Sequence, residues 1–353
     1  MSPALTHYTR IVLTLLAAAA GGAVCWKLDT PLPWMIGAMT VITIAALSGL
    51  PVRSLAPFRA TMITVLGVML GSSFTPALMT HIAEWPIPLA GLLVYCSLTL
   101  AIGMAYFRFV AKNDATTAFF AAAPGGLNEM TIMGAQMGGD ERTISLTHAV
   151  RILLVIFTIP IWFRVFADYV PAAREAAEIG IRSVPLLDLA SLAACAVIGY
   201  FLGKRLRLPA YQVLGPMIVS AAAHLTGLTA ARPPVEIVSM AQVVMGVGIG
   251  CRFTGAKLHE VGRSMLHAAV FAVVLIAITV GCCAVLNEIT DLPVAALVLA
   301  YAPGGLAEMS LVALALSIDI AFVATHHAFR LFIVLLFAPP AFRWLKGRGR
   351  PAS

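Results

Sequence analysis

Charged residues are scarce in this chain. Only 11% of its 353 residues are Asp, Glu, Lys or Arg, whereas 60% are hydrophobic and the mean hydropathy is +0.95. A soluble domain has about 25% charged residues. The composition therefore excludes an ordinary soluble protein and predicts an integral membrane protein, whose main partner is the lipid bilayer.

Long hydrophilic segments are missing as well. None exceeds about twenty residues, which leaves no room for a soluble catalytic, signalling or DNA-binding domain, so we expect no nucleic-acid partner. The net charge of +7 instead indicates how the chain is oriented in the membrane, because Lys and Arg stay on the cytoplasmic side. Ten apolar stretches are long enough to cross a bilayer. They lie at 11–28, 33–50, 57–79, 86–107, 143–163, 185–203, 211–228, 235–255, 264–286 and 320–342.

The six cysteines show no spacing that is typical of a metal site or a disulfide framework. All of them lie in apolar sequence, and no C-x-x-C motif occurs. Cysteines in such surroundings pack as small hydrophobic side chains. We therefore predict neither a cofactor nor a metal site.

The two halves of the chain are similar to each other in sequence. Residues 121–164 align without a gap with residues 300–343, 179 positions further on, and 16 of the 44 pairs are identical. The matched blocks include APGGLNEM at 123–130 and APGGLAEM at 302–309. Such a duplication predicts a repeat architecture. Its parts are a first membrane repeat at 1–166, a linker at 167–184, a second membrane repeat at 185–345 and a basic tail at 346–353.

The segments that carry these blocks, 114–139 and 292–318, either cross the membrane as broken helices or enter and leave on one side. A helix of about ten residues precedes the first break, and it reaches only about half of the ~30 Å hydrocarbon core. If both segments are re-entrant, Lys and Arg in the connections divide 15 to 5 between the two sides; if both cross, they divide 13 to 7. The positive-inside rule favours the re-entrant alternative.

That alternative predicts the fold. We expect an all-α integral membrane protein with about ten transmembrane helices, arranged as two inverted five-span repeats. Each repeat contains a broken re-entrant helical hairpin at its Pro-Gly-Gly motif. Both termini are expected in the cytoplasm, because the basic connections and the basic C-terminal end share one side.

Pro-Gly-Gly interrupts a helix, because Pro lacks an N–H group and Gly permits backbone that helices exclude. Broken backbone at membrane depth occurs where it is buried in protein or lines a cavity. A new helix is expected at Leu127 and at Leu306, and its free N–H groups favour an anion. A structural kink is the alternative, but two related copies favour a binding site. The predicted binding residues at the breaks are Pro124, Gly125, Gly126, Pro303, Gly304 and Gly305.

An acid follows each break, and an arginine lies further on in an apolar span. Glu129 is 11 residues before Asp140, and Arg151 is 11 residues after it. Asp140, and Asp319 in the second half, are expected to be N-caps at the turn before the next helix. If the chain turns back at Asp140, the acid and the base reach the same depth, about 16 Å from the surface. They would form either a permanent ion pair or a pair that opens for a proton or an anionic substrate. The second copy consists of Glu308, Asp319 and Arg330.

Two histidines and one asparagine complete the candidate site. His148 and His327 each precede an arginine by three residues, on the same helix face. A proton relay is one interpretation, and a buried, hydrogen-bonded histidine is the other. Asn128 is matched by Ala307 in the second repeat, so the two sites are not equivalent.

The duplicated APGGL-x-E-M blocks and the downstream H-x-x-R motif resemble the AbrB-type duplicated membrane proteins of bacteria, over essentially the whole chain. The resemblance implies a duplicated architecture in the bacterial inner membrane. Members of the family carry labels such as ammonia monooxygenase or AbrB-family regulator of gene expression. The second name is shared with an unrelated small DNA-binding protein, whose domain this sequence does not contain.

Three functions remain to be compared. We expect a secondary transporter of a small organic anion, coupled to protons or sodium, with the substrate and the coupling ion between the two hairpin tips. A membrane regulator that influences gene expression without transport is an alternative. A monooxygenase would need clustered metal ligands, and the arginines beside the histidines would repel a cation, so we do not expect an enzyme. The sequence leaves homo-oligomerisation open.

Overall fold

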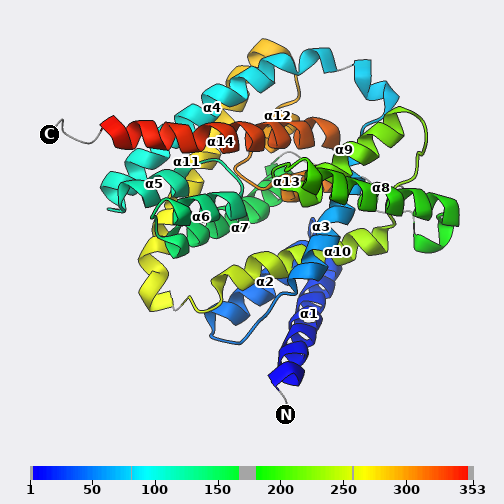
Figure 1. The fold of residues 1–353 in the computed structure, drawn as a ribbon, viewed down its shortest axis with the longest axis horizontal. Helices are drawn as coiled ribbons and strands as arrows, with labels where there is room; N and C mark the ends of the chain where they lie inside the picture. Colours follow the sequence, from blue (N-terminus) through cyan, green and yellow to red (C-terminus); the bar gives the residue numbers. More distant parts are fainter. Residues whose placement is uncertain (1–2, 81, 167–179, 257, 349–353) are drawn as a thin grey trace. The chain divides into compact units, whose positions relative to one another are not determined.

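The computed structural model describes residues 3–80, 82–166, 180–256 and 258–348, and every regular element within these ranges is helical (Figure 1). The all-α prediction is therefore confirmed for the described chain. Most of the linker predicted at 167–184 and most of the tail predicted at 346–353 lie outside the described residues. The four-part division of the chain stays a prediction.

Fourteen α-helices and five shorter helical segments follow one another in the described chain. In the first half of the sequence the α-helices are α1 Pro3–Lys27, α2 Pro33–Leu47, α3 Ala56–Gly71, α4 Pro86–Ala105, α5 Ala115–Ala122, α6 Leu127–Gln136 and α7 Glu141–Phe166. In the second half they are α8 Leu186–Arg205, α9 Tyr211–Leu225, α10 Val235–Gly250, α11 Leu258–Thr290, α12 Val294–Tyr301, α13 Leu306–Ala315 and α14 Ile320–Arg348. The shorter segments are η1 Pro76–Thr80, η2 Ile82–Glu84, the π-helical η3 Tyr106–Val110, η4 Ile181–Ser183 and η5 Cys251–Phe253.

Seven helical stretches of the described chain are long and apolar enough to cross a membrane. Three further apolar helices, α2, α3 and α13, are shorter. The 15 residues of α2 extend about 22 Å, less than the ~30 Å core. The helices are compatible with a multi-pass membrane protein, while the ten-span arrangement stays a prediction. The seven stretches are Tyr8–Lys27, Ile82–Val110, Glu141–Phe163, Leu186–Arg205, Val235–Phe253, Gly262–Thr290 and Ile320–Leu345.

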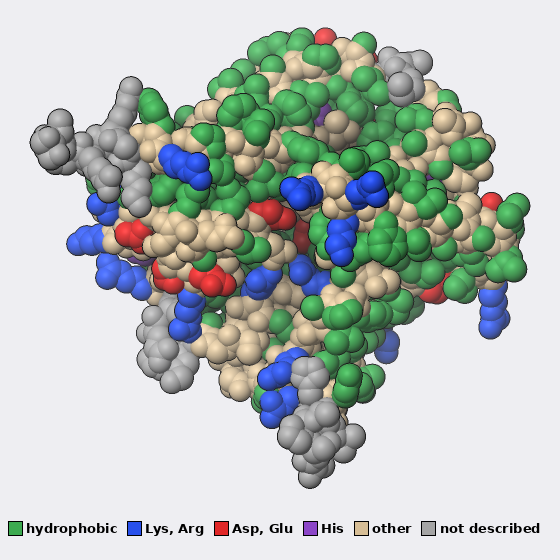
Figure 2. All heavy atoms as spheres, viewed as in Figure 1, with side chains coloured by type: hydrophobic (Ala, Val, Ile, Leu, Met, Phe, Trp, Pro, Cys, Tyr) green, Lys and Arg blue, Asp and Glu red, His purple; other side chains and the backbone are tan. Residues whose placement is uncertain are grey.

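Apolar side chains face outward over much of the molecule. Leu186, Leu187 and Leu228 are each more than 80% exposed. Figure 2 shows hydrophobic side chains spread widely over the face in view, with Lys and Arg between them. A soluble monomer rarely exposes apolar surface on this scale, whereas a lipid-facing surface requires it.

The chain forms two compact units, and each combines segments from both halves of the sequence. Unit 1 contains Met1–Ala83, Ile156–Glu260 and Ala307–Ala324; unit 2 contains Glu84–Val155, Val261–Leu306 and Thr325–Ser353. In unit 1, α1 packs on α2 and α8 packs on α9, while α10 packs on α2 and α3 packs on α9.

Glycines allow these helices of unit 1 to approach one another closely. A Cβ atom on Gly37 of α2 would lie 2.2 Å from the carbonyl oxygen of Gly21 in α1. A Cβ atom on Gly215 of α9 would lie 2.1 Å from the carbonyl oxygen of Gly199 in α8. Small residues commonly mediate such contacts between membrane helices. The two contacts lie 178 positions apart in the sequence.

A second pair of glycine contacts in unit 1 joins one half of the chain to the other. A Cβ atom on Gly67 of α3 would lie 2.5 Å from the carbonyl oxygen of Val213 in α9. A Cβ atom on Gly246 of α10 would lie 2.7 Å from the carbonyl oxygen of Met35 in α2. The glycines are 179 positions apart and their partners 178. The two halves therefore exchange corresponding contacts.

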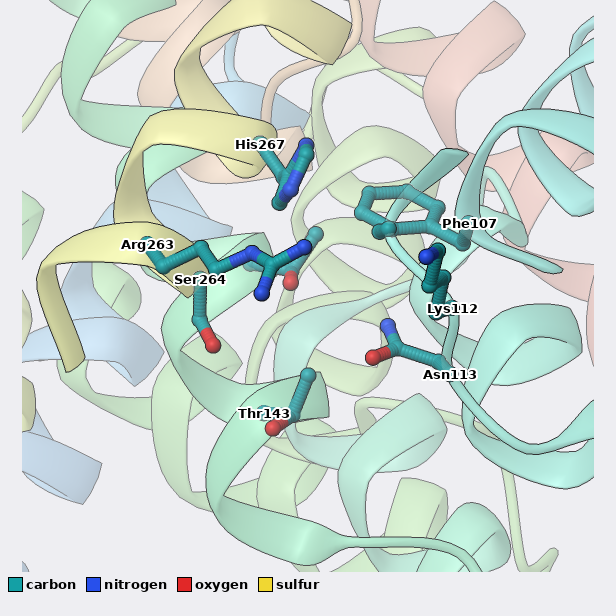
Figure 3. A pocket seen from close by; sticks show the side chains of 9 residues that line it. Phe107, Lys112, Asn113, Thr143, Arg263, Ser264 and His267 are labelled. Carbon is teal, nitrogen blue, oxygen red and sulfur yellow. The ribbon is translucent and has the colours of Figure 1, made fainter. Parts of the chain in front are cut away.

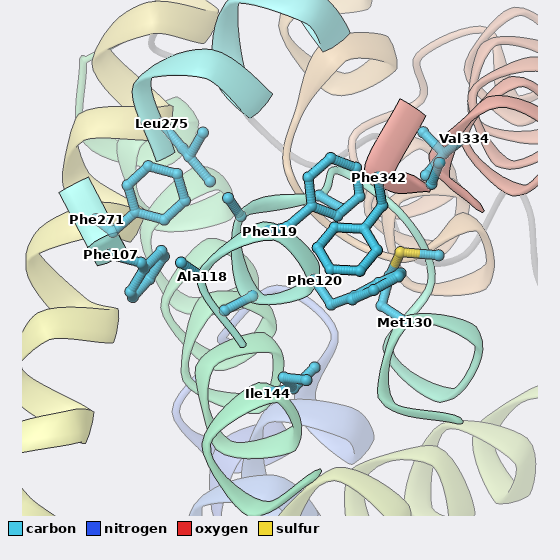
Figure 4. Packing of buried hydrophobic residues seen from close by; sticks show 14 residues of the cluster. Phe107, Ala118, Phe119, Phe120, Met130, Ile144, Phe271, Leu275, Val334 and Phe342 are labelled. Carbon is cyan, nitrogen blue, oxygen red and sulfur yellow. The ribbon is translucent and has the colours of Figure 1, made fainter. Parts of the chain in front are cut away.

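Unit 2 has a hydrophobic core around the half-helix α5 (Figure 4). Phe119 and Phe120 are fully buried, and their ring centroids lie 5.2 Å and 5.5 Å from that of Phe342 in α14. Phe107 packs against Phe271 of α11, with ring centroids 4.9 Å apart. This core fixes the helix that leads into the first break.

Candidate functional site at the two helix breaks

The helix breaks lie where the sequence predicts them. The helix α5 ends at Ala122, and α6 begins at Leu127 after an extended Gly126 with φ −68° and ψ 145°. In the second half α12 ends at Tyr301 and α13 begins at Leu306. Both predicted helix starts are confirmed. The prolines and first glycines of both motifs are buried: Pro124, Gly125, Pro303 and Gly304.

Both aspartates at the following turns cap helices. The carboxylate of Asp140 accepts a hydrogen bond from the backbone N–H of Arg142, at 3.1 Å. The carboxylate of Asp319 accepts from the N–H groups of Ala321 at 2.9 Å and Phe322 at 3.1 Å. Side-chain oxygens at such positions satisfy N–H groups that have no partner within the helix. The predicted caps are confirmed.

At the first break, Arg151 holds the interrupted backbone. The side chain is only 3% exposed, and its guanidinium donates to the carbonyl oxygens of Ala123 at 3.4 Å and Gly125 at 3.1 Å. One turn away, Nε2 of His148 lies 2.9 Å from the carbonyl oxygen of Phe120. A carbonyl only accepts, so Nε2 carries the proton. Both side chains therefore cap carbonyls freed at the end of α5.

The second break repeats these contacts at the same spacing. Arg330 donates to the carbonyl oxygens of Ala302 at 2.7 Å and Gly304 at 2.6 Å. It also reaches the carbonyl oxygen of Tyr301 at 3.4 Å. Nε2 of His327 lies 2.9 Å from the carbonyl oxygen of Leu299. The histidines thus fit the interpretation as buried, hydrogen-bonded residues.

The two breaks differ in how completely these side chains are paired. At the second break, the Arg330 guanidinium donates to Nδ1 of His327 at 2.9 Å. At the first break, Nδ1 of His148 and Nε of Arg151 are buried and have no hydrogen-bond partner. The first break therefore has unused hydrogen-bonding capacity beside a buried positive charge.

The expected ion pair between Glu129 and Arg151 is absent. Both residues are described, yet no ion pair or hydrogen bond joins them, and Arg151 binds backbone carbonyls instead. The half-buried Glu129 folds back over the start of its own helix, where a Cβ atom on Gly126 would lie 2.2 Å from its Oε2 atom. The permanent ion pair is therefore excluded for the first copy, and the alternative, a pair that opens for a proton or an anionic substrate, stays a prediction.

The acid of the second half has different surroundings. Glu308 is buried, at 8% exposed, and belongs to unit 1, whereas Arg330 belongs to unit 2. Whether Glu308 and Arg330 act together stays a prediction. Asn128 is exposed, and the helix that follows the first break has Gly126 at its N-cap position and no side-chain cap. The assignment of all these residues to substrate or ion binding also stays a prediction.

Two tyrosines near the arginines were not singled out from the sequence. Tyr95 and Tyr301 are fully buried, with ring centroids 5.4 Å apart in an edge-to-face arrangement. The hydroxyl of Tyr95 lies 2.9 Å from Oγ1 of Thr279, and Tyr301 donates to the carbonyl oxygen of Pro88. Arg330 donates to the backbone carbonyl oxygen of Tyr301 at 3.4 Å. The available signal was weak: a polar aromatic residue in each of two apolar stretches.

Metal-ligating side chains do not cluster in the part of the chain that the structure describes. No set of three or more His, Cys, Asp or Glu side chains within that part of the chain is placed to hold a metal ion. The six cysteines are free.

Long apolar helices, outward-facing apolar side chains and buried basic groups at broken helices define the class of helical membrane proteins. Within this class, the chain belongs to the AbrB family. The family, described as transition state regulatory protein AbrB, matches residues 34–346. The chain is 28% identical over 358 residues to the uncharacterized protein YhjN of Bacillus subtilis (strain 168), covering 93% of this chain and 91% of YhjN. It is 26% identical over 282 residues to an Escherichia coli (strain K12) protein named as a candidate regulator, AbrB, covering 80% of each.

Proposed function

We propose that this protein is a secondary transporter of a small organic anion, with its binding site at the broken helices. Transport is coupled to protons or sodium, and the substrate neutralises positive charge that the protein itself leaves uncompensated. Discontinuous helices are common binding elements in secondary transporters. The remaining partners in this proposal are the lipid bilayer and the coupling ion.

One observation carries the proposal. Arg151 is buried at 3% exposure, binds only two backbone carbonyls, and has an Nε atom without a partner. An isolated charge in a membrane interior is costly unless it is paired or faces a polar cavity. No described carboxylate forms an ion pair with Arg151. A carboxylate of the substrate would supply the missing charge and accept from the guanidinium.

The architecture proposed for transport is a pair of inverted repeats. It is supported by the exchanged helix contacts in unit 1, where Gly67 contacts the backbone at Val213 and Gly246 contacts it at Met35. It is also supported by matching contacts of the arginines and histidines with carbonyls 26 to 28 residues earlier. Repeats of opposite orientation permit alternating access, because one repeat can move against the other.

Identification of the substrate comes first. We expect one or more compounds in a panel of mono-, di- and tricarboxylates to raise the thermal unfolding temperature of the purified protein, because a ligand that binds only the folded state stabilises it. The active compound is then tested for uptake into proteoliposomes. Proteoliposomes with an imposed proton or sodium gradient identify the coupling ion.

The acids provide the second test. If Glu129 or Glu308 carries the coupling proton, the Glu129→Gln/Glu308→Gln double variant loses gradient-driven uptake but retains binding. The single variants Glu129→Gln and Glu308→Gln show whether the half-buried or the buried acid carries the proton. Unchanged gradient-driven uptake by the double variant would reject the carboxylate role without rejecting anion binding at Arg151.

A regulatory function is the second candidate, favoured by the family description and by the name of the E. coli relative. A strain that lacks the protein would then show altered gene expression. Rescue of that phenotype by a variant that folds but does not transport would identify regulation as a function of its own. Rescue only by transport-competent variants would make the change in gene expression a consequence of transport.

A further inference from the structure

A concave site in unit 2 is lined by residues other than those that cap the helix breaks. It is a cavity of about 220 Å³ between the end of η3, the start of α7 and the start of α11. Figure 3 shows the guanidinium of Arg263 extending from α11 toward Lys112 and Asn113 on the opposite wall, with Thr143 and Ser264 at its edge.

The cavity is positively charged and rich in hydrogen-bond donors. Lys112 and Arg263 line it, and no Asp or Glu is among its lining residues. Both basic side chains are exposed, and neither forms an ion pair or a hydrogen bond with another described residue. The hydroxyl of Ser264 and the amide of Asn113 add neutral donors, whereas the hydroxyl of Thr143 donates to the carboxylate of Asp140.

One wall residue of the cavity has an unsatisfied polar atom. Thr147 is only 2% exposed, and its Oγ1 atom has no hydrogen-bond partner. Buried hydroxyls nearly always have a partner, because leaving one unsatisfied costs about 1–3 kcal/mol. A ligand in the cavity would supply that partner.

The corresponding positions in the other half of the chain show why the cavity exists. Ser264 and Thr147 are each 179 positions from Trp85 and His326, respectively. These two large side chains pack together, with ring centroids 6.4 Å apart. The loop at Lys112 is therefore flanked by two small hydroxyl side chains, whereas the corresponding loop at Asp291 is flanked by two aromatic rings. The small residues leave space that the rings would fill.

The two basic residues of the cavity correspond to acidic residues in the other copy. Lys112 and Arg263 correspond to Asp291 and Glu84. The backbone is the same in both copies, because Lys112 has φ 60° and Asp291 has φ 54°, both left-handed. The left-handed conformation therefore belongs to the shared loop rather than to a ligand, and only the side chains distinguish the basic cavity.

We propose that this cavity binds the phosphate group of an anionic molecule, namely a phospholipid headgroup or a free phosphate compound. Arginine and lysine are the usual phosphate-binding side chains, and hydroxyl and amide groups complete the oxygen coordination. The cavity adjoins the ends of three helices, where basic pockets between membrane helices bind anionic headgroups. This site shares no residue with the anion site proposed at Arg151.

Binding is measured on the full-length protein in phosphate-free detergent solution, with two probes. One probe is inorganic phosphate, followed by the thermal unfolding temperature. The other is phosphatidylglycerol, followed by native mass spectrometry, with phosphatidylcholine as the uncharged comparison. We expect the wild-type protein to bind phosphatidylglycerol in preference to phosphatidylcholine. Stabilisation by inorganic phosphate as well would show that the site takes free phosphate compounds, whereas its absence would assign the site to lipid.

Three variants test whether the cavity itself is responsible. Lys112→Gln/Arg263→Gln removes two charge-assisted contacts and lowers the affinity for the bound probe by about tenfold or more. Ser264→Trp introduces the ring of the other half and blocks the cavity without changing the charge. The control, Lys204→Gln/Arg205→Gln, removes the same charge from exposed positions at the end of α8 and leaves binding unchanged.

Size-exclusion profiles and helical content show whether each variant is folded. Thr147→Val is a further, conservative change, because valine keeps the branched shape of threonine and removes only the hydroxyl. A fewfold loss of affinity in this variant supports the site. The proposal is overturned if the wild-type protein binds neither probe. It is also overturned if Ser264→Trp and Lys112→Gln/Arg263→Gln bind as tightly as the wild type.

Discussion

The two helix breaks have the same backbone contacts but differ in how tightly the arginine is held. Arg330 donates to three carbonyls and to His327, whereas Arg151 donates to two carbonyls, at longer distances. Nε of Arg151 and Nδ1 of His148 have no partner. The second break is therefore the more completely paired of the two, and the first has capacity left for a ligand.

This difference separates two roles that the sequence presents as equal. A buried basic group that caps helix carbonyls stabilises the broken backbone. The same group with unused donors and no counter-ion is suited to bind an anion. In the proposed transporter, the second break is expected to contribute mainly rigidity, and the first to contribute affinity for the substrate.

The largest effect is expected for Arg330→Gln. This variant removes the guanidinium that holds Tyr301, Ala302 and Gly304 through their carbonyl oxygens and leaves buried acceptors without donors. We expect the free energy of unfolding to fall by about 3 kcal/mol or more. Denaturant unfolding in detergent measures it. A loss no larger than that of Arg151→Gln would contradict the distinction between the breaks.

Arg151→Gln is expected to have a smaller effect on stability. It loses two carbonyl contacts, but it also removes a buried Nε atom without a partner. We expect a loss of about 1 kcal/mol, measured under the same conditions. Arg151→Lys, which keeps the charge but loses the planar fork, is the matched variant. It should be about as stable as Arg151→Gln and bind the anion more tightly.

The histidines offer a third comparison. His327→Phe removes two hydrogen bonds, to Leu299 and Arg330, and His148→Phe removes only the bond to Phe120. We expect His327→Phe to be the more destabilising by about 1 kcal/mol. Equal losses in thermal and denaturant unfolding would show that the Arg330–His327 contact contributes nothing. A large loss of transport in His148→Phe with unchanged stability would support a proton relay at His148 instead.

Changes at the N-terminal ends of the helices that precede the breaks are expected to have the smallest effect on the free energy of unfolding. Asp114 caps α5 by accepting from the N–H groups of Thr116 at 2.9 Å and Thr117 at 3.0 Å. The corresponding helix α12 has Pro293 at this position and no side-chain cap. Asp114→Ala should therefore cost about 1 kcal/mol. Asp114→Asn, which preserves the cap, should cost less, and equal effects of the two variants would show that the cap is not what stabilises α5.

The sequence predicts the local features of this site well. Pro-Gly-Gly marks both breaks, Leu127 and Leu306 begin the following helices, and Asp140 and Asp319 cap the turns, because each follows from local backbone chemistry. The burial of the arginines also follows from their apolar neighbours. Apolar helix length is less decisive, since α2 and α3 have only 15 and 16 residues.

The partner of Arg151 could not be predicted in the same way. Counting residues from Asp140 gives the depth of Glu129 and Arg151 but not the direction in which their side chains point. The break itself creates competing acceptors, the carbonyls of Ala123 and Gly125, and Arg151 donates to these. The basic cavity could not be predicted, because it is space that the small side chains of Ser264 and Thr147 leave open. Only the packed structure shows that space.

The central claim is that Arg151 binds an anionic substrate at the first helix break. It is tested most directly by the stabilisation that the active carboxylate gives to the wild-type protein, Arg151→Gln and the exposed control Arg205→Gln. We predict that the rise in unfolding temperature is present in the wild type and in Arg205→Gln and absent in Arg151→Gln. An undiminished rise in Arg151→Gln, in a variant that is folded, would contradict the claim.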